Sequence, residues 1–139
     1  MKKNILILTV FIGLVAFSSC EKNSAASPYF VKATINGANI VYTNYTAAIN
    51  NFNGISVYGY SSTAINTADG INLNFEHLPA DSLMNVWVNY SGVQYGIDSF
   101  TATITAIDSA SVSGTFSGTV STVSNQPAII TNGTFHVPF

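Results

Sequence analysis

Hydrophobic and polar residues alternate with a period of two along most of the chain after residue 28. The clearest run places Ile71, Leu73 and Phe75 on one face and Asn72 and Asn74 on the other. Successive side chains of a strand point to opposite faces, so the alternation predicts strands with one buried and one solvated face. No long stretch has a helical period. Strands are predicted at residues 29–35, 39–46, 55–60, 71–76, 84–90, 100–106, 112–120 and 135–139.

Strands with a single apolar face are typical of antiparallel sheets. The fold class predicted is therefore all-β, an antiparallel β-sandwich of about eight strands. A closed, lipocalin-like β-barrel is the alternative, because periodicity alone does not separate the two. Asn36-Gly37 predicts a tight hairpin turn, and Gly114 and Gly118 within one strand predict bends or bulges.

The N-terminal residues have a pattern that predicts an export signal. Met1-Lys2-Lys3 is basic, and the apolar run 5–17 follows it. At ~1.5 Å per residue this run makes roughly 20 Å of helix, shorter than the ~30 Å core of a bilayer. A basic start, a short apolar stretch and small residues before a cleavage point are typical of a signal peptide.

Cys20, the single cysteine, directly follows the small residues Ser18 and Ser19. This arrangement resembles a bacterial lipobox, which implies cleavage before the cysteine and attachment of fatty acyl chains such as palmitate. An ordinary signal peptide with an unmodified thiol is the alternative. We expect a signal peptide at 1–19, a flexible tether at 20–28 and a single all-β domain at 29–139. Because Glu21 is not the aspartate that retains some lipoproteins in the inner membrane, we expect an outer-membrane location, with the periplasmic or surface face left open.

Charge is sparse, at 7% of residues, and the chain contains no arginine. From Cys20 onward, two lysines stand against six acidic residues, a net charge of −4. Nucleic-acid binding is not expected, because neutralising phosphates needs clusters of Lys and Arg.

Two segments in the last third resemble a family of Bacteroidota lipoproteins of unknown function. "ITAIDSASVSGTFSGTV" (104–120) is similar to that family's T-x-x-D … V-S-G-T-F hairpin, and "IITNGTFHVPF" (129–139) to its closing I-T-N-G-x-F motif. "VKATINGANI" (31–40) resembles the family's first hairpin, although Val41-Tyr42 stands where a tryptophan is usual. The resemblance implies a small exported all-β domain and carries no activity. The residue types at Asp108 and Ser109 suit a turn, and Gly114 and Gly133 suit positions that a Cβ would crowd.

Chemistry-bearing residues are few. The sequence has no spaced His/Cys cluster for a metal, no G-x-S-x-G element and no cofactor motif, so no metal, cofactor or catalytic residue is predicted. We expect a protein that is not an enzyme. A small hydrolase is the least favoured hypothesis, and it requires two of a small set of side chains to converge in a pocket. That set is His77, Glu76, Asp81, Asp98 and His136.

Aromatic and amide residues give a better candidate. Tyr58 and Tyr60 share one strand face, and Trp87 shares another with Asn85 and Asn89. Rings among amides can stack on a sugar while the amides bond its hydroxyls, so these five residues are the candidate binding surface. Packing of the same rings at sheet edges is the alternative.

Three Asp-Ser pairs followed by an apolar residue resemble the acceptor of Bacteroidota periplasmic O-glycosylation. The candidate serines are Ser82, Ser99 and Ser109. Turn chemistry favours Asp-Ser equally.

The first functional hypothesis is a lipid-anchored, non-catalytic binding or accessory module of the cell envelope. The membrane would be contacted through the lipid, and the partner would be a glycan, an envelope protein or a small apolar ligand. The alternative is a structural, fimbria-like envelope subunit that associates through exposed strand edges.

Overall fold

The structure, a computed structural model, describes residues 28–49, 54–61, 69–76 and 82–139. The predicted signal peptide and nearly all of the tether, including Cys20, lie outside these residues, as do His77 and Asp81. The described residues form strands and no helix, which confirms the all-β prediction. The strands are β1 (Phe30–Ile35), β2 (Ala38–Tyr42), β3 (Asn44–Ile49), β4 (Ile55–Tyr60), β5 (Gly70–Glu76), β6 (Ser82–Tyr90), β7 (Val93–Ile107), β8 (Ser111–Ser121) and β9 (Pro127–Pro138).

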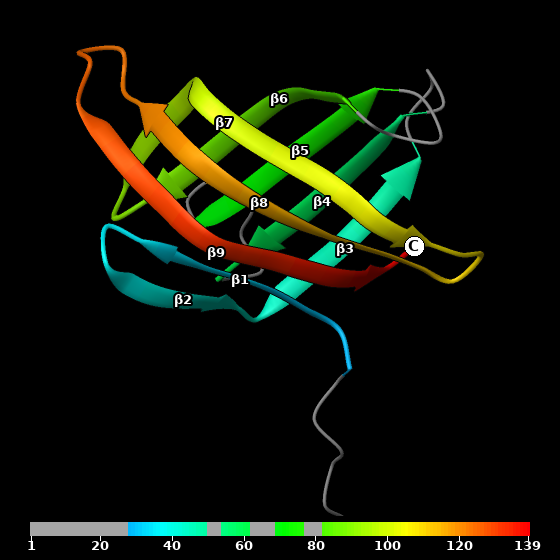
Figure 1. Ribbon diagram of the computed structural model, residues 1–139. Helices are drawn as coiled ribbons and strands as arrows, with labels where there is room; N and C mark the ends of the chain where they lie inside the picture. The colour runs from blue at the N-terminus through cyan, green and yellow to red at the C-terminus, as the bar shows by residue number, and fades with distance from the viewer. Residues whose placement is uncertain (1–27, 50–53, 62–68, 77–81) are drawn as a thin grey trace, which may run out of the picture.

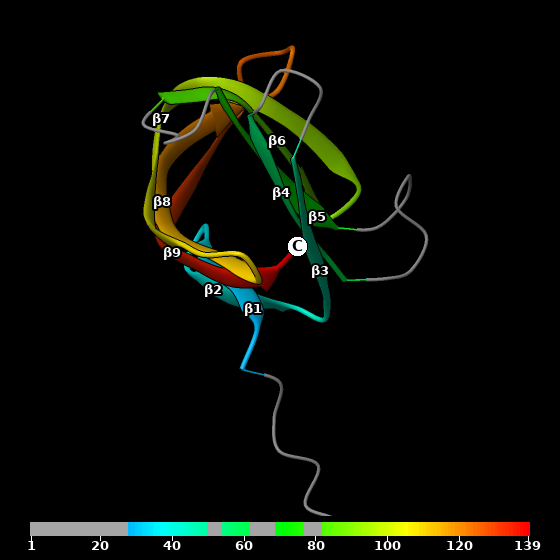
Figure 2. The same cartoon turned by 90° about the vertical axis from the view of Figure 1, so that its right-hand side faces the viewer.

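All nine strands belong to one antiparallel sheet in the order β2-β1-β9-β8-β7-β6-β5-β4-β3 (Figure 1). The first strand of the chain, β1, therefore lies next to the last, β9. The sheet curls until β3 lies against β9 and β1 against β4, which gives a nearly closed barrel (Figure 2). Register shifts in the β1–β9, β5–β6, β7–β8 and β8–β9 pairs account for the curl, because bulges bend and twist a strand.

Two sharp corners divide the sheet into two walls. At one corner the chain bends at Thr43, so that β2 pairs with β1 and β3, directly after it, pairs with β4. At the other, β7 pairs with β6 through its first residues and with β8 from Gly96 onward, with a register shift between Ile97 and Ser99. One continuous sheet thus has two facing walls, which is why an alternating sequence fits both a sandwich and a barrel.

The barrel interior is filled by the apolar residues of the alternating pattern. Ile71, Leu73 and Phe75 of β5 point inward and are buried, as the sequence predicts. They join one contiguous core with inward-facing residues from each of the remaining eight strands.

The Asn36-Gly37 turn is confirmed: both residues have positive φ, 48° and 84°, as a type I′ hairpin requires. The Asn36 side chain adds a contact that its turn role does not predict. Its Oδ1 accepts the Ile129 N–H at 2.9 Å, and the Asn36 backbone N–H donates to the Ile129 carbonyl at 2.9 Å. The first hairpin is thereby fastened to the start of β9.

Four strand predictions differ from the structure. The closing strand was expected at 135–139, but β9 runs from Pro127 to Pro138, since two consecutive exposed residues, Thr131 and Asn132, interrupt its alternation. The segment 39–46 is two strands, because the chain turns the barrel corner at Thr43 without a change in its alternation. β7 starts at Val93 instead of Phe100, since Gly96 and Asp98 interrupt its apolar pattern. Met84 was expected on the buried face but is 58% exposed, because a bulge opposite Asn74 and Phe75 shifts the phase of β6.

Strands β8 and β9 pack closely through two glycine–phenylalanine pairs, and each strand supplies one glycine and one phenylalanine. Gly114 lies opposite Phe135, and Phe116 lies opposite Gly133. A Cβ on Gly114 would overlap the Phe135 ring and the Thr103 carbonyl, and one on Gly133 would overlap the Phe116 ring and carbonyl. The close approach expected at both glycines is therefore present. The two rings stack with centroids 6.4 Å apart, and Phe75 of the opposite wall contacts Phe135 at 6.2 Å.

Alanine at Gly114 or at Gly133 should destabilise the protein by about 3 kcal/mol, the upper part of the range for overpacked cores. Part of each overlap is with a backbone carbonyl, which cannot rotate away. Gly96→Ala is the matched control, because a Cβ there meets nothing within 4 Å. It should change stability by less than about 0.5 kcal/mol. Urea unfolding measures all three; equal stabilities would contradict the ring-over-glycine packing.

Candidate functional site

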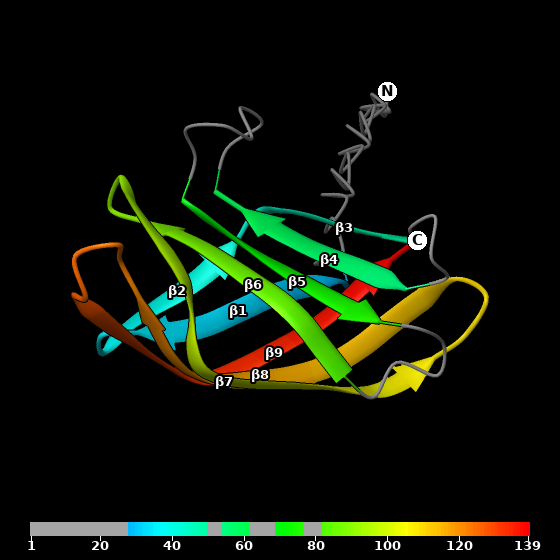
Figure 3. The same cartoon turned by 90° about the horizontal axis from the view of Figure 1, so that it is seen from above.

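Strands β4, β5 and β6 lie side by side (Figure 3). Their outward side carries ordered rows of aromatic and amide side chains. In the central row, Tyr58 pairs with Asn72, which pairs with Trp87. These residues share a face because directly opposed residues of antiparallel strands point the same way. The adjacent rows are Tyr60, Gly70 and Asn89 on one side and Ser56, Asn74 and Asn85 on the other.

The central row and the row of Tyr60, Gly70 and Asn89 enclose a groove of about 160 Å³, here called the amide groove. Tyr58, Tyr60, Trp87 and Asn89, four of the five predicted binding residues, line it. The Trp87 ring is 50% exposed, whereas the two tyrosines are half-buried. The groove is therefore walled by tyrosines on one side and by the exposed tryptophan on the other.

The fifth predicted residue, Asn85, does not line the groove. It lies one row away, opposite Asn74, whose Oδ1 accepts the Ser56 hydroxyl at 2.7 Å. Sequence reasoning missed Asn72 and Gly70, which supply the floor of the groove. The signal was present, since Asn72 belongs to the polar face of its strand, but only the register places it between Tyr58 and Trp87.

Asn72 has an unsatisfied polar atom. Its Oδ1 is buried and has no hydrogen-bond partner among the described residues. An unpaired buried acceptor costs about 1–3 kcal/mol, more than a typical completed hydrogen bond contributes. The residues lining the groove carry no charge, so its chemistry is ring faces, amides and tyrosine hydroxyls.

The residues considered for catalysis are dispersed where the structure describes them. Glu76 is exposed at the end of β5, and the Asp98 carboxylate accepts the Ser121 hydroxyl at 3.1 Å. Within the described ranges, no group of three His, Cys, Asp or Glu side chains is placed to hold a metal ion.

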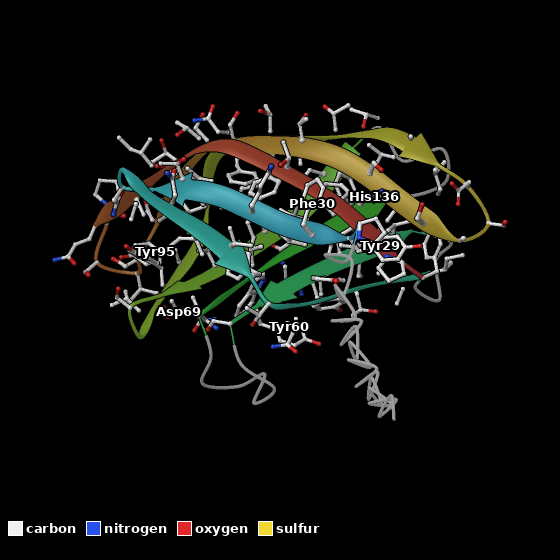
Figure 4. All side chains as sticks on the ribbon, turned by 90° about the horizontal axis from the view of Figure 1, so that it is seen from below. Tyr29, Phe30, Tyr60, Asp69, Tyr95 and His136 are labelled. Atoms are coloured by element: carbon white, nitrogen blue, oxygen red, sulfur yellow. The ribbon has the colours of Figure 1, made fainter. Side chains whose placement is uncertain are left out.

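His136 points outward from β9 and is half-buried. Its Nδ1 lies 2.7 Å from the Ser113 hydroxyl, its cross-strand neighbour on β8. The Tyr29 ring lies 5.0 Å from the imidazole, and Phe30 is its neighbour on β1 (Figure 4). The Lys32 ammonium lies 4.8 Å from the centre of the Phe30 ring. These side chains form a cluster across β1, β9 and β8, and none of them lines the amide groove.

The three candidate glycosylation serines differ in setting. Ser109 is exposed in the β7–β8 turn, and Ser99 is exposed on β7. Ser82 is the first residue of β6, and its side chain lies outside the described part. At Ser109 the turn chemistry is explicit: Asp108 Oδ1 accepts the N–H groups of Ala110 at 2.7 Å and Ser111 at 2.8 Å.

Comparison with models of known protein families, with curated protein sequences and with solved structures finds no match in any of the three. No helix among the described residues is long and apolar enough to cross a membrane. The candidate site therefore rests on its own geometry.

Substitution of Asp108 should reveal a pH-dependent turn. The two N–H donors, with a smaller contribution from the Ser111 hydroxyl, lower the pKa of Asp108 below its ordinary value of 3.8. A lowered folded-state pKa means that the stabilisation is present above pH 3.8 and is lost as pH falls through the folded value. At neutral pH, Asp108→Asn should melt at a lower temperature than the wild type, because a neutral oxygen accepts these bonds more weakly.

This difference in melting temperature should shrink below about pH 4, as the wild-type carboxylate protonates. Thermal unfolding followed at pH 7 and at acidic pH measures it. Ser109→Ala, in the same turn, is the control and should show a constant difference. If the difference in melting temperature between Asp108→Asn and wild type stays the same at acidic pH, the hydrogen bonds assigned to the Asp108 carboxylate are contradicted.

Proposed function

We propose that this protein is a lipid-anchored envelope lipoprotein whose β-domain is a non-catalytic module that binds a glycan. The proposal includes removal of residues 1–19, acylation of Cys20, an outer-membrane location and membership of the Bacteroidota family that the sequence resembles. The lipobox-like segment supports the anchor. The convergence of Tyr58, Asn72 and Trp87 in one row supports the binding role and carries the proposal.

The row has the two elements that sugar recognition needs. The C–H face of a sugar ring packs against an aromatic face, and the half-exposed Trp87 indole supplies such a face without rearrangement of the backbone. Amide groups then exchange hydrogen bonds with the sugar hydroxyls. Asn72 Oδ1 is buried and lacks a partner in the described structure. A rotation of the Asn72 side chain that exposes this oxygen to a ligand hydroxyl would recover the energy of an unpaired acceptor.

A ligand for this groove should be neutral. No acidic or basic residue of the described ranges lines the groove, so a charged ligand would lose hydration without gaining an opposite charge from them. The same absence among the lining residues gives a hydrolase no carboxylate pair at this position. A glycan-binding module accounts for these residues better than a hydrolase does.

A structural envelope subunit is the second candidate, and the outer edge of β2 favours it. β2 ends the sheet order, and its residue Val41 is 63% exposed. An exposed strand edge can pair with another chain. The edge is only five residues long, which limits the number of main-chain bonds that it can offer.

Replacement of Trp87 by alanine should weaken glycan binding at least about tenfold, as for a central aromatic contact. Isothermal titration with neutral oligosaccharides selected on a glycan array measures the loss. Tyr58→Ala should lower affinity in the same direction. Val41→Ala removes exposed apolar surface outside the groove and is the matched control, with affinity expected to stay unchanged. If Trp87→Ala binds as tightly as wild type, the amide groove is not the glycan site.

The lipid anchor is tested separately by intact mass. Expression of the full chain in a Bacteroidota host should give a protein that begins at Cys20 and carries the added mass of acyl chains. Cys20→Ala should lose that mass and leave the membrane fraction. Additional hexose-type mass on the mature chain would locate O-glycans, with Ser99→Ala and Ser109→Ala assigning them. An unmodified chain cut elsewhere would refute the anchor.

A further inference from the structure

A second and larger groove lies beside the first. It encloses about 670 Å³ between the β6–β7 hairpin and the β8–β9 loop, which lie at the same end of the barrel (Figure 1). We call it the hairpin groove. It exists because the first residues of β7 pair only with β6, whereas β8 joins β7 from Gly96 onward. The strand edge at Val93–Tyr95 therefore faces the loop across open space.

The loop that forms the far wall is held by its own hydrogen bonds. The Thr122 N–H donates to the Gln126 carbonyl at 3.0 Å, and the Gln126 N–H donates to Thr122 Oγ1 at 3.0 Å. The hydroxyls of Thr122 and Ser124 are 3.1 Å apart. These bonds fix the wall before any ligand arrives, which lowers the ordering penalty of binding.

Trp87 lines both grooves. On its far side, Trp87 pairs with Gly96, and Gly96 pairs with Ser121, so the central row continues from the amide groove into the hairpin groove. Gly96 has no side chain to block the passage, and a Cβ placed on it would meet nothing within 4 Å. The indole therefore stands between two depressions on a continuous surface.

The row from Tyr58 to Ser121 crosses five neighbouring strands, β4 to β8. Four strand spacings of ~4.8 Å give a path of roughly 19 Å. This is longer than a single sugar ring. The hairpin groove repeats the chemistry of the amide groove, since the described residues that line it carry hydroxyls and amides and no charge. A carboxylate next to this lining, that of Asp98, accepts the Ser121 hydroxyl at 3.1 Å.

We infer that the two grooves form one binding path centred on Trp87, which takes an internal stretch of a neutral polysaccharide chain laid across the strands. The inference rests on the proposed glycan-binding function and adds to it the length and the direction of the ligand. Sugar units on one side of the indole occupy the amide groove, and units on the other side pass over Gly96 toward Ser121.

Titration of the purified protein with neutral oligosaccharides of one to six units, from the cello-, malto-, xylo-, manno- and N-acetylchito- series, tests this path. Wild type should bind six-unit chains of the preferred series at least about tenfold more tightly than two-unit chains, because longer chains fill both grooves. Gly96→Gln should remove most of that gain by filling the passage, so that it binds six-unit chains little more tightly than two-unit chains. Thr105→Gln, exposed on the same strand, is the matched control and should bind like wild type.

The outcomes separate this inference from the function on which it rests. Equal affinity for two-unit and six-unit chains overturns the path and leaves a glycan site confined to the amide groove. Retention of the length dependence by a folded Gly96→Gln variant also overturns it. If Gly96→Gln weakens short and long chains alike, the ligand lies in the hairpin groove alone. No binding of any series by wild type rejects the glycan-binding function itself.

Discussion

The contact between Phe116 and Phe135 organises the interior of this barrel. Each ring lies over a glycine of the neighbouring strand, so β8 and β9 approach more closely than two side chains would allow. Phe100 of β7 packs on Phe116 at 6.1 Å, and Phe75 of β5 reaches Phe135 at 6.2 Å. A run of aromatic rings therefore links three adjacent strands to the opposite wall. Because aromatic side chains bury the largest apolar areas, this run sets the separation of the two walls.

Closure of the sheet depends on a second close approach. Gly59 of β4 faces Val31 of β1, and a Cβ there would collide with Val31 and crowd the Tyr42 ring. The absence of that atom lets β4 approach β1 where the chain bends from β2 into β3. Tyr42 is buried at this seam, and burial, followed by the charge of Asp69 and the neighbouring Tyr90, raises the pKa of its hydroxyl. The hydroxyl therefore stays protonated, and the seam holds no buried charge.

The alternation in the sequence predicts most of the strands and most of the faces they bury, because side-chain direction along a regular strand follows from the period. It also places Trp87, Tyr58 and Asn89 on outward faces. It does not predict which strands are neighbours, since that depends on corners at Thr43 and near Ile97 that leave the period almost intact. Asn72 was missed for this reason: its place between Tyr58 and Trp87 is a property of register. Met84 was misplaced because it is the extra residue of a bulge: Asn74 pairs with Asn85 and Phe75 pairs with Leu83. The assignments after the bulge, Val86 and Val88, are buried as predicted.

The scarcity of charge connects the surface of the protein to the ligand proposed for it. With so few charged groups, the outer face is hydrated chiefly through amides and hydroxyls, which exchange hydrogen bonds with water. A sugar presents the same kind of hydroxyl donors and acceptors as that water, together with an apolar ring face. It can replace the water without desolvating an ion, and the exposed Trp87 indole gains contact area in the exchange. A charged partner would lose its hydration and find no counter-charge among the residues that line either groove. The composition that makes this surface rely on neutral polar groups thus also makes a neutral, hydroxyl-rich chain its best match.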